Sequence, residues 1–207
     1  MKCWVIARRE LRGIFTTTTG WLVLGGFWML AGFFWSSMVS FYLLQSAELV
    51  SNPYTQAEIR LSEHLLSPFF GNLSVILLMI MPALTMRLFA EERKQGTLEL
   101  LFSSPISTTD IVAGKAIAVF FFLLVMLAGT LYAPLTLWTW GQLDIGLLAC
   151  GYLGVFLMAA AVSSMGMLCS ALTENQVVAL ILAFSASLAM WVLAWIKIGR
   201  ASCRERV

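Results

Sequence analysis

The chain has 207 residues, of which 60% are hydrophobic and only 12% are charged, and its formal net charge is +2. Soluble domains carry roughly a quarter charged residues, because their surface must face water. The composition therefore excludes an ordinary soluble domain and indicates a protein whose surface faces lipid. The small net charge gives no support for nucleic acid as a partner.

The first candidate element is a short amphipathic helix over residues 4–15. Apolar residues from Trp4 to Phe15 recur on one stripe at helical spacing, and Ile6 does not fit that stripe. Such a helix can lie in the headgroup region with its arginines toward lipid phosphate. The residues assigned to this interfacial helix are Trp4, Arg8, Arg9, Leu11 and Arg12. An ordinary basic flank that anchors the first membrane span is an equal alternative.

Five apolar stretches follow, each long enough to cross a bilayer as a helix, which takes about 20 residues. The first is too long for the apolar region of a secretory signal, so we expect an uncleaved span. The sequence thus predicts an all-α fold, a polytopic membrane helix bundle with five transmembrane helices. The predicted spans are residues 21–44, 70–89, 116–138, 145–169 and 177–196.

Two features of the spans predict how the helices pack. Pro82 and Pro134 lie inside the second and third spans, and each removes a backbone donor, so we expect a kink at both. The fourth span is rich in small residues, which favours close helix–helix packing over lipid exposure. These small residues are Gly146, Gly151, Gly154, Ala159, Ala160, Ala161, Ser163, Ser164 and Gly166.

The distribution of lysine and arginine predicts the orientation. Basic residues precede the first span (Lys2 to Arg12) and fill the segment between the second and third spans, whereas the segment 45–69 holds only Arg60. The positive-inside rule therefore places the N-terminus in the cytoplasm. Five spans would put the tail 197–207 outside, yet that tail is also basic. We expect that this tail is not native to the fold and that a sixth span is missing.

The segment between the second and third spans carries the most specific pattern. A charge cluster is followed by Gly96 and Thr97, and then by apolar residues at the spacing of one helical face. The run from Ser107 to Asp110 is a capping box that should begin the third span. A short helix with one apolar face between two membrane spans needs either the bilayer surface or a partner protein. A solvated charged loop is the alternative.

This segment resembles the second cytoplasmic segment of the ABC-2 type permeases, the membrane subunits of bacterial ABC exporters, including the gliding-motility and copper-enzyme-maturation branches. The residues that carry the resemblance are Glu91-Glu92-Arg93-Lys94-Gln95-Gly96-Thr97-Leu98-Glu99, followed by Pro105. The resemblance extends over residues 1–196, which we treat as one transmembrane domain. Members of the family usually have six spans, and the chain shows five before its tail.

The resemblance implies a mechanism and a set of partners. Residues 91–105 would be a cytoplasmic coupling segment that docks on a separate ATPase subunit, which holds the ATP and magnesium. The docking surface would comprise Gly96, Thr97, Leu98, Glu99, Leu101 and Phe102, and the residues that set the charge register would be Glu91, Glu92, Arg93 and Lys94. A second permease copy or a paralogue would complete the transporter in the bacterial inner membrane.

The chain lacks several motifs that other functions require. No G-x-x-x-x-G-K-[ST] phosphate loop and no H-E-x-x-H motif occurs, so we expect no enzyme activity and no cofactor in this chain. The four cysteines form no C-x-x-C pair, and His64 near Glu58 and Glu63 is only a weak candidate for a metal or an enzyme site. An ion-coupled secondary transporter and a membrane assembly factor without transport activity are the alternatives. The sequence does not indicate the substrate.

Overall fold

The computed structural model describes residues 2–51, 61–94, 107–139 and 144–204, and within them every regular element is a helix. The predicted all-α class is therefore confirmed for these residues. The helices are α1 (Lys2–Thr16), α2 (Thr18–Ser51), α3 (Leu61–Thr85), α4 (Arg87–Lys94), α6 (Thr108–Gly129), α7 (Tyr132–Thr139), α8 (Ile145–Leu172) and α9 (Gln176–Arg204).

Five stretches are long and apolar enough to cross a membrane, as the sequence predicted. Their positions agree with the predicted spans, but the third begins at Thr108 instead of residue 116, because the capping box starts the helix there. The second contains Arg87 near its end. The candidate spans are Thr18–Ser46, Leu65–Ala90, Thr108–Trp138, Ile145–Leu172 and Gln176–Leu193.

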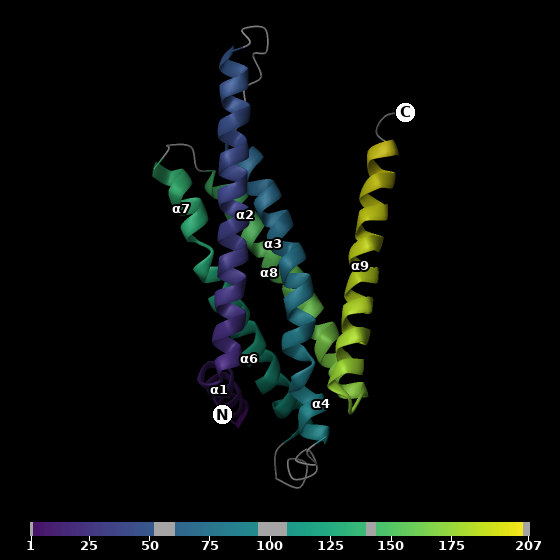
Figure 1. Cartoon of the computed structure of the whole chain (residues 1–207). Coiled ribbons are helices and arrows are strands. Elements are labelled where there is room, and N and C mark those ends of the chain that lie inside the picture. The colour runs from purple at the N-terminus through teal and green to yellow at the C-terminus, as the bar shows by residue number, and fades with distance from the viewer. Residues whose placement is uncertain (1, 52–60, 95–106, 140–143, 205–207) are drawn as a thin grey trace.

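The long helices run up and down alternately, and two short helices gather at one end of the bundle (Figure 1). α1 and α4 lie at that end, and the C-terminal end of α9 lies at the other. α9 packs on α8 and α3 and continues to Arg204, through the boundary predicted at residue 196. Whether residues 197–207 are native to the fold stays a prediction.

α3 and α8 form the most extensive helix pair in the bundle. Small residues on one face of α8 make this possible: a Cβ at Gly151 would lie 2.1 Å from the Phe70 ring, and one at Gly166 would lie 2.0 Å from Oγ1 of Thr85. Gly154, by contrast, has open space around it. The predicted packing role of the small residues in the fourth span is thus right for one face of α8 and wrong for the other, which is exposed.

The third span is broken near its proline. α6 ends at Gly129 and α7 begins at Tyr132, so the helix is interrupted before Pro134. Proline has no N–H to give to the carbonyl of Thr130, and this oxygen instead accepts a bond from the Ala133 N–H at 3.1 Å. The predicted distortion is present, but it takes the form of a break that lies on the N-terminal side of Pro134.

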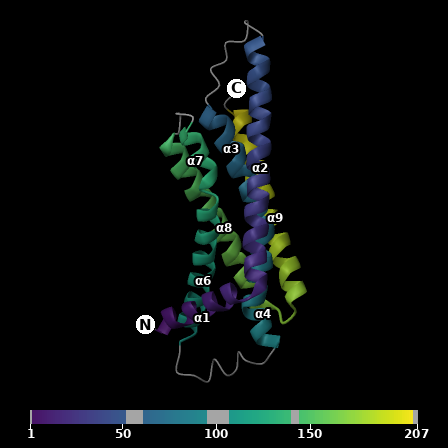
Figure 2. The same cartoon turned by 60° about the vertical axis from the view of Figure 1, so that its left-hand side comes forward.

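α1 lies across the lower end of the bundle, at a steep angle to the long helices (Figure 2). It packs along α6, where Ile6 sits against Gly114 and Ala7 is fully buried. Trp4 is instead 64% exposed. The face of α1 that packs on α6 therefore includes Ile6, which does not fit the predicted stripe, whereas Trp4 of that stripe is exposed; the interfacial role of the stripe stays a prediction.

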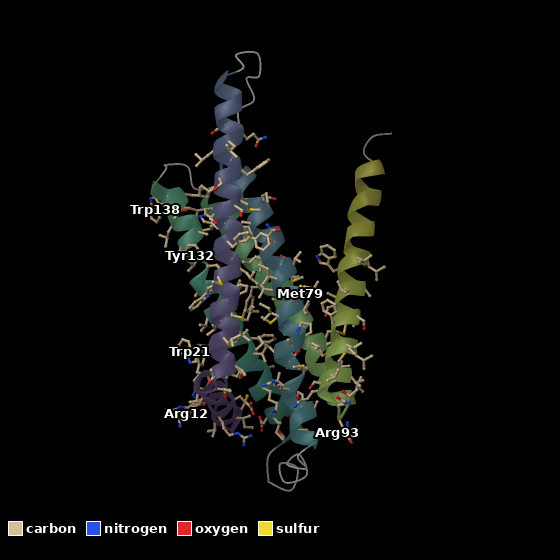
Figure 3. All side chains as sticks on the ribbon, in the orientation of Figure 1. Arg12, Trp21, Met79, Arg93, Tyr132 and Trp138 are labelled. Atoms are coloured by element: carbon tan, nitrogen blue, oxygen red, sulfur yellow. The ribbon has the colours of Figure 1, made fainter. Side chains whose placement is uncertain are left out.

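The exposed side chains differ between the two ends of the bundle (Figure 3). Arg12 and Arg93 both lie at the end that carries α1 and α4, and Trp21 lies slightly above Arg12. Trp138 lies in the half of the bundle toward the other end. Trp21 and Trp138 are both mostly exposed. Tryptophans at two levels of a helix bundle are typical of the two membrane–water interfaces.

Candidate functional site

The candidate site is the end of the bundle where α1, α4, the start of α6 and the end of α8 meet. α4 follows α3 after the single residue Met86 and leads directly into the segment 95–106. Among the predicted docking residues, Gly96, Thr97, Leu98, Glu99, Leu101 and Phe102 lie outside the described residues. Glu91, Glu92 and Lys94 belong to α4, but the structure describes only the backbone there. Of the predicted charge cluster, Arg93 alone has a described side chain.

The N-terminus of α4 is capped by a side chain from another helix. Met86 stands at the position before α4 and has no polar side chain, so it cannot accept a bond from the first N–H groups of the helix. Oγ of Ser170 on α8 accepts from the N–H groups of Phe89 at 3.2 Å and Ala90 at 3.1 Å. The same hydroxyl donates to the Met86 carbonyl at 2.9 Å. The Ser170 hydroxyl therefore satisfies backbone groups on both sides of the junction between α3 and α4.

The other end of α4 is also tied to α8. Arg93 donates from Nη1 to the Ala171 carbonyl at 3.1 Å, and its Nε lies 3.5 Å from a carboxylate oxygen of Glu174. The side chains of Arg93 and Glu174 are 45% and 74% exposed, so solvent screens the ion pair and its contribution to stability is small. The cation at the C-terminal end of α8 also lies where the helix dipole favours positive charge.

On its opposite side α4 meets a buried lysine from α6. Lys115 is 1% exposed. Its Nζ donates to the Leu88 carbonyl at 2.6 Å and lies 3.4 Å from Oε1 of Glu10 on α1. The ammonium also stands 5.1 Å from the centroid of the Phe89 ring, which is the geometry of a cation–π contact. A buried charge needs such partners, because its desolvation is expensive.

The sequence interpretation missed Lys115 and Ser170, although it contained a signal for the lysine. Lys115 was assigned to the loop before the third span, but the capping box at Ser107 is confirmed as the start of α6, with Oγ of Ser107 accepting from the Asp110 N–H at 3.2 Å. Lys115 then falls on the same helical face as the buried residues Ile111 and Val119. No sequence signal indicates that Ser170 caps a helix far away in the chain.

Replacement of Ser170 with alanine is expected to loosen the start of α4. It removes the acceptor for two N–H groups and the donor to Met86, which should cost about 1–2 kcal/mol. The measurement is hydrogen exchange at the amides of Phe89 and Ala90, which should become faster. Ser164→Ala is the matched control, because the Ser164 hydroxyl bonds only within α8, to Ala160 at 2.9 Å. Equal exchange in both variants would contradict the capping role.

The described residues were also compared with the requirements of a metal site. The described residues contain no group of three His, Cys, Asp or Glu side chains close enough to hold a metal ion. The three described cysteines are all free, and the side chains of Glu58, Glu63 and His64 lie outside the described set. The contacts at this end connect helices to one another, which suits a mechanical role.

Comparison with known protein families adds the class of protein. Residues 36–197 match the ABC-2 family transporter protein family. The chain belongs to this family. The match includes the segment 91–105 and all five candidate spans at least in part, whereas α1 lies before it. Searches of curated proteins and of solved structures gave no match.

Membership fixes the coarse function of this ABC-2 family protein. The chain is a multi-pass membrane protein, and its family suggests that it is a permease subunit of an ABC transporter. Proteins of this family typically lack catalytic activity and associate with an ABC ATPase. The expected resemblance is thereby confirmed at the level of the family. The branch within the family and the expected missing span are untested.

Proposed function

We propose that this ABC-2 protein is the permease subunit of an ATP-driven exporter and that residues 91–105 dock on the separate ATPase. ATP and magnesium would bind to that partner, and this chain would supply the membrane path. The observation that carries the proposal is the position of α4. It leads from a membrane span straight into the segment 95–106, at an end of the bundle where hydrogen bonds join α4 to both α6 and α8.

The charges at this end support a cytoplasmic location in the bacterial inner membrane. Arg8, Arg12, Arg87 and Arg93 are all exposed, and they come from the two helices, α1 and α4, that gather there. Basic residues flanking membrane spans favour the cytoplasmic side. The basic residues of the tail remain the exception to this distribution.

α1 supports the proposal through its outer face. Trp4 and Val5 are 64% and 67% exposed, and Arg8 and Arg12 of the same helix are exposed as well. Because α1 lies across the bundle, this face can rest in the headgroup layer with the arginines near lipid phosphate. We therefore assign α1 as an interfacial helix rather than a simple basic flank.

In the proposed mechanism, ATP binding closes two ATPase subunits, and the docked segment moves with them. α4 moves with the segment and displaces α8, to which Ser170 and Arg93 connect it. Rigid-body displacement of packed helices is a common way to change access to a membrane path. A second copy or a relative of this chain would form the other half of the path.

The docking proposal is tested by placing a charge on the apolar face of the segment. Leu98→Asp and Leu101→Asp should each weaken co-purification of the partner ABC ATPase by at least roughly 30-fold, as expected when a central interface contact is lost. Ser103→Asp adds the same charge to the same segment at a residue outside the predicted docking set and should have little effect.

Two results would contradict the proposal. One is retention of the ATPase by both leucine variants when membrane insertion is normal. The other concerns orientation and uses a cysteine-free chain with Ser104→Cys. Labelling of that cysteine from outside intact cells by an impermeant thiol reagent would place the segment on the wrong side of the membrane.

A further inference from the structure

The buried ammonium of Lys115 on α6 contacts both α1 and α4. It holds one acceptor from each of two helices that are far apart in the sequence: the Leu88 carbonyl on α4 and the Glu10 carboxylate on α1. Neither the family match nor the docking proposal assigns a role to this residue.

We infer that Lys115 is a positioning residue that transmits displacement of α4 to the interfacial helix α1. The reason is that the Lys115 ammonium has acceptors on both α4 and α1. A buried ammonium needs its acceptors, because losing one of its hydrogen bonds costs far more free energy than losing a hydrogen bond at the exposed surface. α4 cannot move away from Lys115 without either breaking the 2.6 Å bond to Leu88 or taking the lysine with it.

The packing around Lys115 favours the second outcome. A Cβ at Gly114, the residue beside it, would lie 2.9 Å from Ile6 Cβ and 3.1 Å from the Cys3 carbonyl oxygen, so α1 and α6 are in very close contact. Closely packed helices move together, because interiors deform little. A displacement that reaches Lys115 should therefore reach both α6 and α1.

The opposite side of α4 provides a way to test the link without a partner protein. Ser170 holds α4 to α8, and it contacts Phe89, Ala90 and Met86 but no residue of α1. An effect of Ser170→Ala on α1 can pass through α4 and Lys115, or directly from α8 to α6, and replacement of Lys115 distinguishes the two routes. If Lys115 is the connection, this effect should disappear when Lys115 is replaced. Such dependence is the direct measure of coupling between two sites.

The experiment follows the native thiol of Cys3, which is partly buried on α1. The full chain in lipid nanodiscs has its other three cysteines replaced by alanine, and the rate of labelling by a small thiol reagent is measured. Ser170→Ala should raise this rate roughly two- to tenfold, the change expected from the loss of a hydrogen bond. Ser164→Ala is the matched control and should leave the rate unchanged.

The same comparison is then made in the Lys115→Met background. This substitution by itself should raise the labelling rate, because α1 loses a contact. Ser170→Ala should then add no further increase. An equal fold-increase with and without Lys115 would overturn the inference, since the lysine would then stabilise α1 without transmitting anything. No increase from Ser170→Ala in the wild-type background would also overturn it.

A milder variant covers the case in which Lys115→Met fails to insert. Glu10→Gln weakens the contact of Lys115 with α1 and keeps the one with Leu88, so it should also abolish the response of Cys3 to Ser170→Ala. A response that persists at full size would again overturn the inference. The role of this link in transport rests on the proposed function, but its measurement needs no ATPase. Loss of ATPase docking and loss of the link are therefore separate results.

Discussion

Alanine at Gly20 is expected to open the corner between α1 and α2 and to destabilise the protein by about 3 kcal/mol, as overpacking against a rigid neighbour does. A Cβ at this position would lie 2.1 Å from the carbonyl oxygen of Ile14 and 3.0 Å from its carbonyl carbon. The neighbour is backbone, so no side chain can rotate out of the way. α1 has to move instead.

Two measurements follow the change at Gly20. Resistance to unfolding by sodium dodecyl sulfate in mixed micelles should fall, and labelling of Cys3 should become faster as α1 leaves α6. Gly25→Ala is the control within the same helix, because Gly25 has open space around it. Its alanine should leave stability unchanged or raise it by up to about 1 kcal/mol, as helix propensity predicts. Identical behaviour of the two variants would refute the steric explanation of the corner.

Alanine at Gly129 should have the next largest effect, because this glycine lets α2 and α6 cross closely. A Cβ there would lie 2.1 Å from Cε2 and Nε1 of Trp28. The indole N–H donates to the Met126 carbonyl at 3.0 Å, so the ring cannot move without losing that bond. The overpacking and the lost hydrogen bond together should cost about 2–4 kcal/mol.

A second substitution should restore part of the stability that Gly129→Ala loses. Trp28→Leu removes the ring and makes room, so the double variant Trp28→Leu/Gly129→Ala should be less unstable than the sum of the two single variants. Gly154→Ala, which meets nothing within 4 Å, is the matched control in a membrane span. Additive losses in the double variant would show that the two residues do not compete for the same space. Stability is again measured by unfolding in mixed micelles.

Several elements follow from local sequence alone. The five spans are recognised because a lipid-facing helix must be apolar along its length, and this requirement does not depend on neighbouring helices. The capping box at Ser107 and the distortion before Pro134 are equally local, since each concerns hydrogen bonds within one turn. The charge-free stretch that begins at residue 116 is only part of the helix of the third span, which begins at Thr108 after the predicted capping box.

The candidate site was only partly accessible from the sequence. The segment 91–105 was recognised by its pattern, and the family match includes it, but its docking role is untested. The predicted role of Arg93 toward a partner protein stays a prediction, and the structure adds its contacts with Ala171 and Glu174 of the same chain. Periodicity alone also left open which residues of α1 pack on α6, because it gives the spacing of apolar residues and says nothing of their neighbours.

The sequence by itself determined the class of the protein, the number of candidate spans and the position of the segment between the second and third, because hydrophobicity and local hydrogen bonding act within single elements. Only the tertiary structure decided that Lys115 is buried between α1 and α4 and that Ser170 caps a helix far away in the chain. The physical reason is that a buried charge and an unpaired helix end take their partners from whatever lies next to them in space.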